Sequence, residues 1–247
     1  MRRRGLLLLL AALAAPACAR AGEVRVAVAA NFAEPAREIA RRFEQRTGHR
    51  ATLSFGSSGQ FYAQIANGAP FDVFLSADAE RPRRLEAAGL AAPGSRFTYA
   101  VGRLVLWSRD PGRVDGEGRV LARGGFEKLA IADPTAAPYG RAAMETLRAL
   151  GLHERVRGRI VQGASITQAY QFVRTGAAEL GFVALSQVVS EKGGSRWLVP
   201  ARLHAPIHQQ AVLLRAAARK PAARAFADFL KSDEARAVVR TYGYEVP

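Results

Sequence analysis

The chain of 247 residues contains one cysteine, Cys18, and only four histidines. A single cysteine excludes an intramolecular disulfide bond, and none of the histidines falls in a zinc-binding or catalytic motif. His204 and His208 are spaced four residues apart, but Pro206 between them disfavours the helix that would pair them as metal ligands. The composition therefore gives no support to a disulfide-stabilised domain, a cysteine nucleophile or a zinc site.

Long apolar runs are also missing, apart from one near the N-terminus. A basic start at residues 2–4 precedes an apolar run from Leu6 to Ala15, and the small residues up to Ala21 offer cleavage sites. This layout is typical of a secretory signal peptide, and the run is too short for a permanent anchor. We expect residues 1–21 to be removed, with a periplasmic location and no stable membrane insertion. Lipidation at Cys18 is the alternative, although the residues before it match a lipoprotein site poorly.

Acidic residues are scarce beside basic ones. The formal net charge is +15, and without the four arginines of residues 1–21 it is +11. The basic residues are spread along the chain and form no basic and aromatic cluster, so we expect no nucleic-acid partner. Such a surface helps to steer an anionic ligand but does not identify it.

Short apolar strands alternate with amphipathic helices, which predicts an α/β fold with mostly parallel sheets. Strands are predicted at residues 24–28, 51–55, 72–75, 104–107, 129–132, 159–161, 180–185 and 210–214. Helices are predicted at residues 33–46, 58–66, 140–150, 166–174 and 222–241, the last with a break near Ser232 and Asp233. The pattern changes character near residues 100–104 and 200–210. We therefore expect a discontinuous domain I (22–102 and 206–247), an inserted domain II (103–205), and a hinge at the two crossings.

Four of the predicted strands run into small or hydroxyl-bearing residues that open a helix. These loops are residues 29–32, 55–59, 133–140 and 163–167, two in each predicted domain. Ligands bind at the carboxyl ends of parallel strands, and several helix N-termini that converge form an anion site. Taken singly, each loop has a simpler explanation, in which Asn31, Ser58 and Ser165 are helix N-caps and the glycines only form turns.

The residue types in these loops restrict the ligand. Apart from Asp133 they offer neutral groups, chiefly hydrogen-bond donors. A protonated phosphate needs an acceptor facing it, whereas a fully ionised tetrahedral oxyanion does not. The loops therefore favour sulfate, molybdate or tungstate. Asp133 could be such an acceptor, although an Asp-Pro pair more often orders a turn.

At these loops the chain resembles the periplasmic molybdate-binding proteins of ABC transporters. The matching stretches are residues 29–32, 54–59, 68–78, 132–134, 138–140 and 242–244, of which 68–78 (Gly-Ala-Pro-Phe-Asp-Val-Phe-Leu-Ser-Ala-Asp) is the most specific. The resemblance implies a periplasmic-binding-protein-like fold, in which two α/β domains close on the anion without covalent chemistry or a cofactor. It also implies delivery to a permease and its ATPase, and we expect a monomer.

The resemblance also implies which residues hold the anion: Ala30, Asn31, Ser58, Tyr139 and Ile166. They would contact the oxygens of the anion and not its metal atom. Asn31 and Ser58 would supply side-chain and backbone donors, Tyr139 and Ile166 mainly backbone N–H groups, and Ala30 an additional contact. Some family members have serine in place of Asn31, and some have a tyrosine where this chain has Ala184. The hydroxyl missing at Ala184 must then be replaced, for instance by Asn31 or Tyr139.

Other functions remain open at this stage. A binding protein for another oxyanion, such as sulfate or phosphate, or for an organic anion would share these loops, and a sensor could use the same fold. A hydrolase is disfavoured because Ser57 and Ser58 do not form the Gly-x-Ser-x-Gly motif of that class. Selectivity between molybdate and tungstate depends on the dimensions of the cavity, which the sequence does not give.

Overall fold

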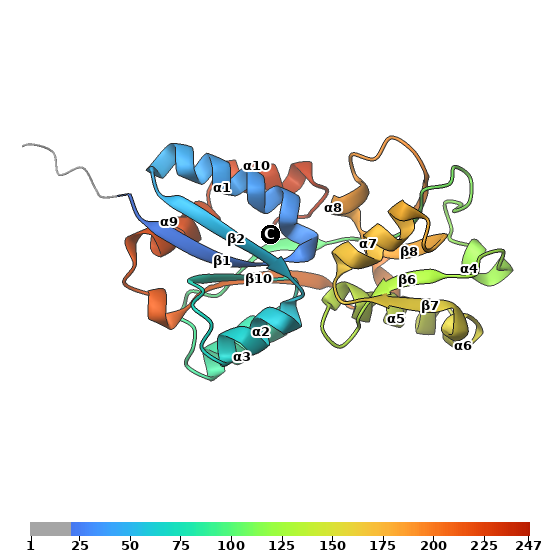
Figure 1. Cartoon of the computed structure of the whole chain (residues 1–247), viewed down its shortest axis with the longest axis horizontal. Helices are drawn as coiled ribbons and strands as arrows, with labels where there is room; N and C mark the ends of the chain where they lie inside the picture. The colour runs from blue at the N-terminus through green and yellow to red at the C-terminus, as the bar shows by residue number, and fades with distance from the viewer. Residues whose placement is uncertain (1–20) are drawn as a thin grey trace, which may run out of the picture.

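The computed structural model describes residues 21–247. The predicted signal peptide, apart from Ala21, and Cys18 lie outside this range. Within it, two five-stranded sheets lie end to end along the long axis of the molecule (Figure 1). The first has the order β2-β1-β3-β10-β4, formed by β1 (Glu23–Ala29), β2 (Arg50–Gly56), β3 (Val73–Ser76), β4 (Phe97–Gly102) and β10 (Ile207–Leu213). The second has the order β7-β6-β8-β5-β9, formed by β5 (Leu104–Ser108), β6 (Leu129–Ala132), β7 (Ile160–Gly163), β8 (Leu180–Ala184) and β9 (Ser195–Leu198).

Helices cover both faces of the first sheet. On one side lie α1 (Ala33–Thr47) and α10 (Asp233–Thr241), and on the other α2 (Ser58–Ala66) and α3 (Glu80–Ala87) (Figure 1). A 3-10 helix, η1 (Ala30–Phe32), joins β1 to α1, and α9 (Pro221–Phe229) contacts β1 and β10. Around the second sheet lie α4 (Val120–Arg123), α5 (Pro138–Ala149), α6 (His153–Val156), α7 (Ile166–Thr175) and α8 (Leu185–Val188). None of the helices formed within residues 21–247 is both long enough and apolar enough to cross a bilayer.

The apolar strands are explained by this burial on two faces. In β1, Val24, Val26 and Val28 pack in a core with residues of α1, α9 and α10, whereas Ala27 faces a second core with Phe61 of α2. A strand covered on both sides reads as a continuous apolar run, and this is why the sequence identifies β1 clearly.

Most of the predicted elements are confirmed, including the break before α10, where the side chain of Ser232 caps Asp233–Thr241. The two-domain α/β fold is confirmed as well. The expectation of mostly parallel sheets is wrong, because each sheet contains as many antiparallel as parallel pairings. The antiparallel pairings belong to β10 and β5, the strands on which the chain crosses between the sheets. Helix α3 and strands β4 and β9 were not predicted, since α3 is mostly charged and contains Pro82 and β9 is short.

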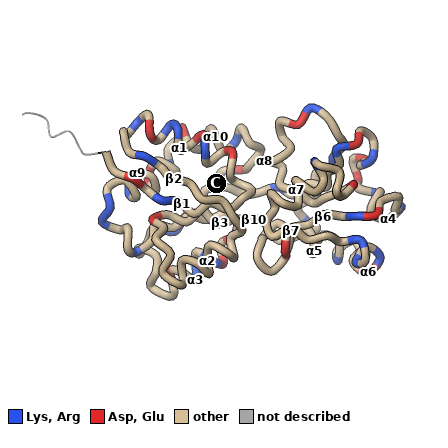
Figure 2. Tube along the Cα trace, viewed as in Figure 1, with Lys and Arg blue, Asp and Glu red and all other residues tan. Residues whose placement is uncertain are grey.

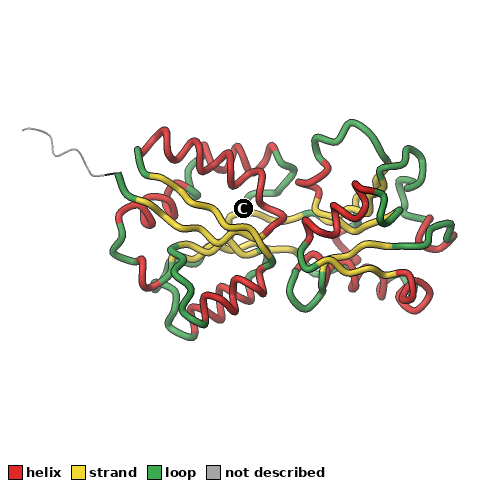
Figure 3. Tube along the Cα trace, viewed as in Figure 1, coloured by secondary structure: helices red, strands yellow, loops and turns green. Residues whose placement is uncertain are grey.

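The chain crosses between the two sheets twice. Only Arg103 separates β4 from β5, and residues 199–206 lead back from β9 to β10. Both crossings are short (Figure 3). Lys and Arg are scattered over both halves of the molecule (Figure 2). His208 lies in β10, and His204 ends a short 3-10 turn, so the two are not on a common helix, as expected.

Candidate functional site

All five residues that were expected to hold an anion lie around one small cavity between the two sheets. The cavity is lined by Ala29, Ala30, Asn31, Gly56, Ser57, Ser58, Ala77, Ala137, Pro138, Tyr139 and Ile166. These residues come from the four loops singled out in the sequence and from the end of β3. The cavity is small, and its lining comes from both halves of the molecule, so a bound anion would contact both of them.

Ser58 is the first residue of α2, and its hydroxyl is available to a ligand. The preceding residue, Ser57, is the N-cap, and it forms a capping box with Gln60. The hydroxyl oxygen of Ser58 accepts a hydrogen bond from the backbone N–H of Ala77 at 2.9 Å. An oxygen that accepts in this way keeps its own hydrogen free to donate. The alternative explanation of Ser58 as an N-cap is therefore wrong, since Ser57 fills that role.

Asn31 lies in η1, and its side chain is engaged within the protein. Its Nδ2 donates to Oε1 of Gln209 at 2.8 Å and to the hydroxyl of Tyr244 at 2.9 Å. Its backbone carbonyl oxygen accepts from the hydroxyls of Ser186 at 2.8 Å and Tyr244 at 2.7 Å. Both amide hydrogens are thus used, and the expectation of a side-chain donor from Asn31 does not fit these contacts. The backbone N–H, at the start of a helical turn, is the group that remains.

Tyr139 and Ile166 stand at the N-termini of α5 and α7. Ile166 is the first residue of α7 after the N-cap Ser165, whose side chain accepts from the N–H of Gln168, so Ser165 is a cap as the simpler explanation held. Tyr139 follows Pro138, the first residue of α5. N–H groups in a first helical turn have no partner within the helix and carry partial positive charge. The N-termini of α2, α5 and α7 therefore converge on the cavity, and Tyr139 and Ile166 are placed to offer backbone donors.

Behind the cavity lies a buried group of polar side chains, which we call the tyrosine–glutamine cluster: Asn31, Tyr99, Tyr139, Gln209 and Tyr244. Gln209 stands at its centre, since its Oε1 accepts from Asn31 and from the hydroxyl of Tyr99 at 3.1 Å, and its Nε2 donates to the hydroxyl of Tyr139 at 3.3 Å. Gln209 was not predicted from the sequence, although a glutamine inside the apolar strand β10 is a signal of such a cluster.

The tyrosines of this cluster are neutral. Burial raises the pKa of Tyr244 to about 12, and it raises the pKa values of Tyr99 and Tyr139 well above that of a free tyrosine. Desolvation penalises the charged phenolate and so keeps the proton in place. The cluster thus adds no negative charge beside an anion at neutral pH.

Two other candidates take different roles. One carboxylate oxygen of Asp133 accepts from both the N–H and the hydroxyl of Thr135 at 2.8 Å, so Asp133 orders a turn and is not an acceptor in the site. Ala184, at the end of β8, is fully buried and lies outside the set of residues that line the cavity. Within the described part of the chain, no charged side chain and no histidine lines the cavity.

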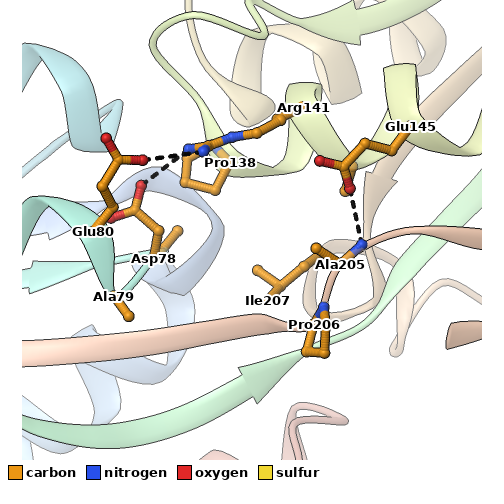
Figure 4. A pocket seen from close by; sticks show the side chains of 11 residues that line it. Asp78, Ala79, Glu80, Pro138, Arg141, Glu145, Ala205, Pro206 and Ile207 are labelled. Atoms are coloured by element: carbon orange, nitrogen blue, oxygen red, sulfur yellow. Dashed lines mark hydrogen bonds and ion pairs between the residues drawn. The ribbon is translucent and has the colours of Figure 1, made fainter.

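Two wider grooves flank the cavity. The larger, with a volume of about 490 Å³, shares Ala30 and Asn31 with it and is also lined by Arg37 and Arg174. The smaller, of about 200 Å³, shares Ala77 and Pro138 with it (Figure 4). The larger groove is also lined by Glu34, which forms an ion pair with Arg37, so its charged side chains leave a net charge of only +1 toward an approaching anion.

Comparison with known proteins gives a consistent result. Residues 24–245 match the family of bacterial extracellular solute-binding proteins. The chain is 56% identical over 238 residues to the molybdate-binding protein ModA of Rhodobacter capsulatus, covering 96% of this chain and 93% of that protein. It is 55% identical over 232 residues to the molybdate-binding protein ModA of Azotobacter vinelandii, covering 92% of each. Among solved structures, the periplasmic molybdate-binding protein of Azotobacter vinelandii is similar with a TM-score of 0.88 and 45% identity, covering 91% of this chain and 99% of that one.

Proposed function

The chain belongs to the family of bacterial extracellular solute-binding proteins, and on this basis we propose that it captures molybdate between its two halves for an ABC uptake transporter. The single observation that carries the proposal is the cavity itself, on which three helix N-termini and the segment Ala30–Asn31 converge. Hydrogen bonds to a charged group contribute about 1.5–3 kcal/mol each, so a few such donors suffice for tight binding.

The chemistry of the lining favours a fully ionised oxyanion. Among the described residues, those around the cavity bring no carboxylate, and Asp133 is turned to Thr135. A protonated phosphate would leave its own hydroxyl without an acceptor, which is costly in a buried site. Sulfate, molybdate and tungstate all satisfy this condition. The names of the two relatives with more than half of their residues identical favour molybdate among them.

We propose that Ala30, Asn31, Ser58, Tyr139 and Ile166 hold the oxygens of the anion. Ser58 would donate through its hydroxyl, and the others chiefly through backbone N–H groups. The domain limits that go with this proposal are 22–102 with 206–247 for domain I and 103–205 for domain II. The crossing at Arg103 and the crossing at residues 199–206 would then be the hinge on which the halves close.

Export and delivery complete the proposal. A signal peptide at residues 1–21 would direct the chain to the periplasm, where the protein acts as a monomer. There it would pass the anion to a membrane permease driven by an ATPase, without any covalent chemistry of its own. Tungstate, which has the same shape and charge as molybdate, would bind as well.

Calorimetric titration of the mature, anion-free protein with molybdate, tungstate, sulfate and phosphate tests the proposal. We expect tight binding of molybdate and tungstate, with little heat from sulfate or phosphate. Tight binding of sulfate or phosphate in their place would leave the anion site in the cleft supported and would show that molybdate is not its ligand. No binding of any of the four would contradict the assignment of an inorganic oxyanion.

A further inference from the structure

Charged side chains join the two halves of the molecule beside the cavity. Arg141 of α5 contacts Asp78, in the segment between β3 and α3, and Glu80, the first residue of α3 (Figure 4). Its Nη2 lies 3.4 Å from Oδ2 of Asp78, and its Nη1 lies 3.1 Å from Oε2 of Glu80. The hydrogen bond from Arg141 lowers the pKa of the Glu80 carboxyl, as expected for an ion pair. Because α5 follows β6 whereas Asp78 and Glu80 follow β3, these contacts bridge the two sheets.

A second arginine extends the bridge. Arg81, which is 8% exposed, forms an ion pair with Asp78, and its Nη2 donates to the carbonyl oxygen of Thr135 at 2.8 Å. The backbone N–H of Gly59, in α2, donates to the carbonyl oxygen of Ala136 at 2.9 Å. A Cβ atom at Gly59 would lie 2.9 Å from Cα of Ala136, so only glycine allows the backbones to come this close. The loop that opens α5 is therefore held from two elements of the other half.

The bridging residues lie on the same short segments as the proposed ligand donors. Asp78 directly follows Ala77, whose N–H fixes the hydroxyl of Ser58. Arg141 stands two residues after Tyr139, within the first turns of α5. We therefore expect a change in the distance between Asp78 and Arg141 to change the distance between the Ser58 hydroxyl and the N-terminus of α5. The contact with Arg141 also gives a role to Asp78, whose carboxylate does not line the cavity. Asp78 is the last residue of the stretch 68–78, the most specific of the stretches on which the family resemblance rests.

We propose that Asp78 and Arg141 are positioning residues, which form an ion-pair latch across the cleft that holds the halves closed on the bound anion and slows its release. The latch rests on the proposed function only for the identity of the anion, because its contacts are between side chains of the protein and do not involve the ligand. Breaking it should raise the dissociation rate roughly 2- to 5-fold, the upper range for a partly exposed ion pair. The association rate should change little, because most affinity differences between related complexes arise in dissociation.

A different explanation makes the opposite prediction for one variant. If Arg141 acted only as a positive charge near the anion, removing the negative charge of Asp78 would strengthen binding. The latch requires that Asp78→Asn and Arg141→Gln both weaken binding. Because Asp78 also pairs with Arg81 and Arg141 also contacts Glu80, the double variant should lose less than the sum of the two single losses. Asp78→Asn keeps an oxygen for the N–H of Arg81 and the hydroxyl of Ser76, which now bond to Oδ1. Arg141 is partly exposed, so Arg141→Gln provides a second variant that should fold.

The experiment follows the release of labelled molybdate after an excess of unlabelled molybdate is added. Arg148→Gln is the matched control, because it removes one positive charge from an exposed position of the same helix. We expect faster release from Asp78→Asn and from Arg141→Gln, and wild-type release from the control. Release at the wild-type rate from both variants, or slower release from Asp78→Asn, would overturn the latch.

A measurement without ligand separates the latch from the identity of the anion. Since Cys18, in the predicted signal peptide, is the only cysteine in the sequence, spin labels can be placed cleanly on the mature protein at Ala88→Cys and Arg155→Cys, exposed positions in different halves. We expect the distance distribution between the labels to be longer or broader in Asp78→Asn and Arg141→Gln than in the parent. Unchanged distributions would contradict the latch. If the protein bound none of the oxyanions, this measurement would still decide whether the latch exists.

Discussion

The hydroxyl oxygen of Ser58 is held by the backbone N–H of Ala77 at 2.9 Å, across from the end of β3. The hydroxyl hydrogen is then directed away from Ala77, and the fully buried side chain has the cavity beside it. The neighbouring Ser57 uses its oxygen to cap α2. The two consecutive serines thus have different roles: Ser57 caps the helix and Ser58 faces the site.

We expect Ser58→Ala to weaken molybdate binding by about 1–3 kcal/mol, because an anion oxygen and the Ala77 N–H both lose a partner. Isothermal titration measures this directly. Ser57→Ala is the matched control, which should lower the free energy of unfolding by about 1 kcal/mol through loss of the cap and change affinity much less. Equal losses of affinity in the two variants would contradict the division of tasks.

The backbone donor at Ile166 can be removed without unfolding the helix. Proline is favoured at the first position of a helix, where its missing N–H breaks no internal bond. Ser165, the residue before it, has φ −146° and ψ 167°, an extended conformation that a following proline accepts. We therefore expect Ile166→Pro to fold and to bind molybdate about 1–3 kcal/mol less tightly.

Ile166→Val separates this effect from a change of side chain. It keeps the N–H, so its affinity should stay close to that of the wild type, with a stability cost of about 0.5–1.5 kcal/mol. Wild-type affinity in Ile166→Pro, with folding verified by circular dichroism, would remove this N–H from the donor set.

The sequence was informative where local rules decide the structure. Strands such as β1 are covered on both faces, so their apolar runs stand out, and the loops after them carry small residues where helices begin. The carboxyl ends of parallel strands gather at one edge, and for this reason the four loops could be placed around a common site. These rules apply within a few residues of the chain and need no knowledge of distant partners.

The rest depends on contacts between distant parts of the chain. Gln209 meets Asn31 from 178 residues away, and Tyr244 meets it from 213 residues away. Ser57 is the N-cap of α2 and Ser58 is its first residue. The composition of the loop does not show at which of the two serines the helix begins. Likewise, the resemblance implied a side-chain donor at Asn31, whose Nδ2 in this structure donates to Gln209 and Tyr244.

Gly102, the last residue of β4, lies against the buried hydroxyl of Tyr139 from the other half. A Cβ atom at this position would lie 2.2 Å from the Tyr139 oxygen and 2.8 Å from Nε2 of Gln209. We expect Gly102→Ala to lower the free energy of unfolding by about 1–3 kcal/mol, as overpacking does, and to weaken binding by holding the halves apart. Chemical denaturation and titration measure the two effects.

The double variant Gly102→Ala with Tyr139→Phe tests the cause. Removing the hydroxyl eliminates the closest contact, so part of both losses should be recovered relative to Gly102→Ala alone. Strictly additive losses would show that the clash with Tyr139 is not the cause. Tyr139→Phe by itself should bind nearly as the wild type does, since its hydroxyl bonds to Gln209 and only its backbone N–H is assigned to the anion.

The buried tyrosines predict how stability changes in alkali. Burial raises the pKa of Tyr244 to about 12, from the 10.0 of an unperturbed tyrosine. The folded protein therefore binds this proton more tightly than the unfolded chain does. The stabilisation is fully present below the unfolded pKa, near pH 10, and is lost as the pH rises through about 12.

Urea denaturation at pH values between roughly 9 and 12 brackets the unfolded and folded pKa values of Tyr244. Over this range the free energy of unfolding should fall more steeply in the wild type than in Tyr244→Phe. A difference of two pKa units corresponds to about 3 kcal/mol, so the stability gap between the proteins should narrow by up to this amount. Tyr244→Phe also loses the hydrogen bonds to Asn31 and Ser186, but that loss is constant with pH. Parallel curves would mean that the phenol ionises equally well in the folded and unfolded chains, and that the cluster behind the cavity is open to water.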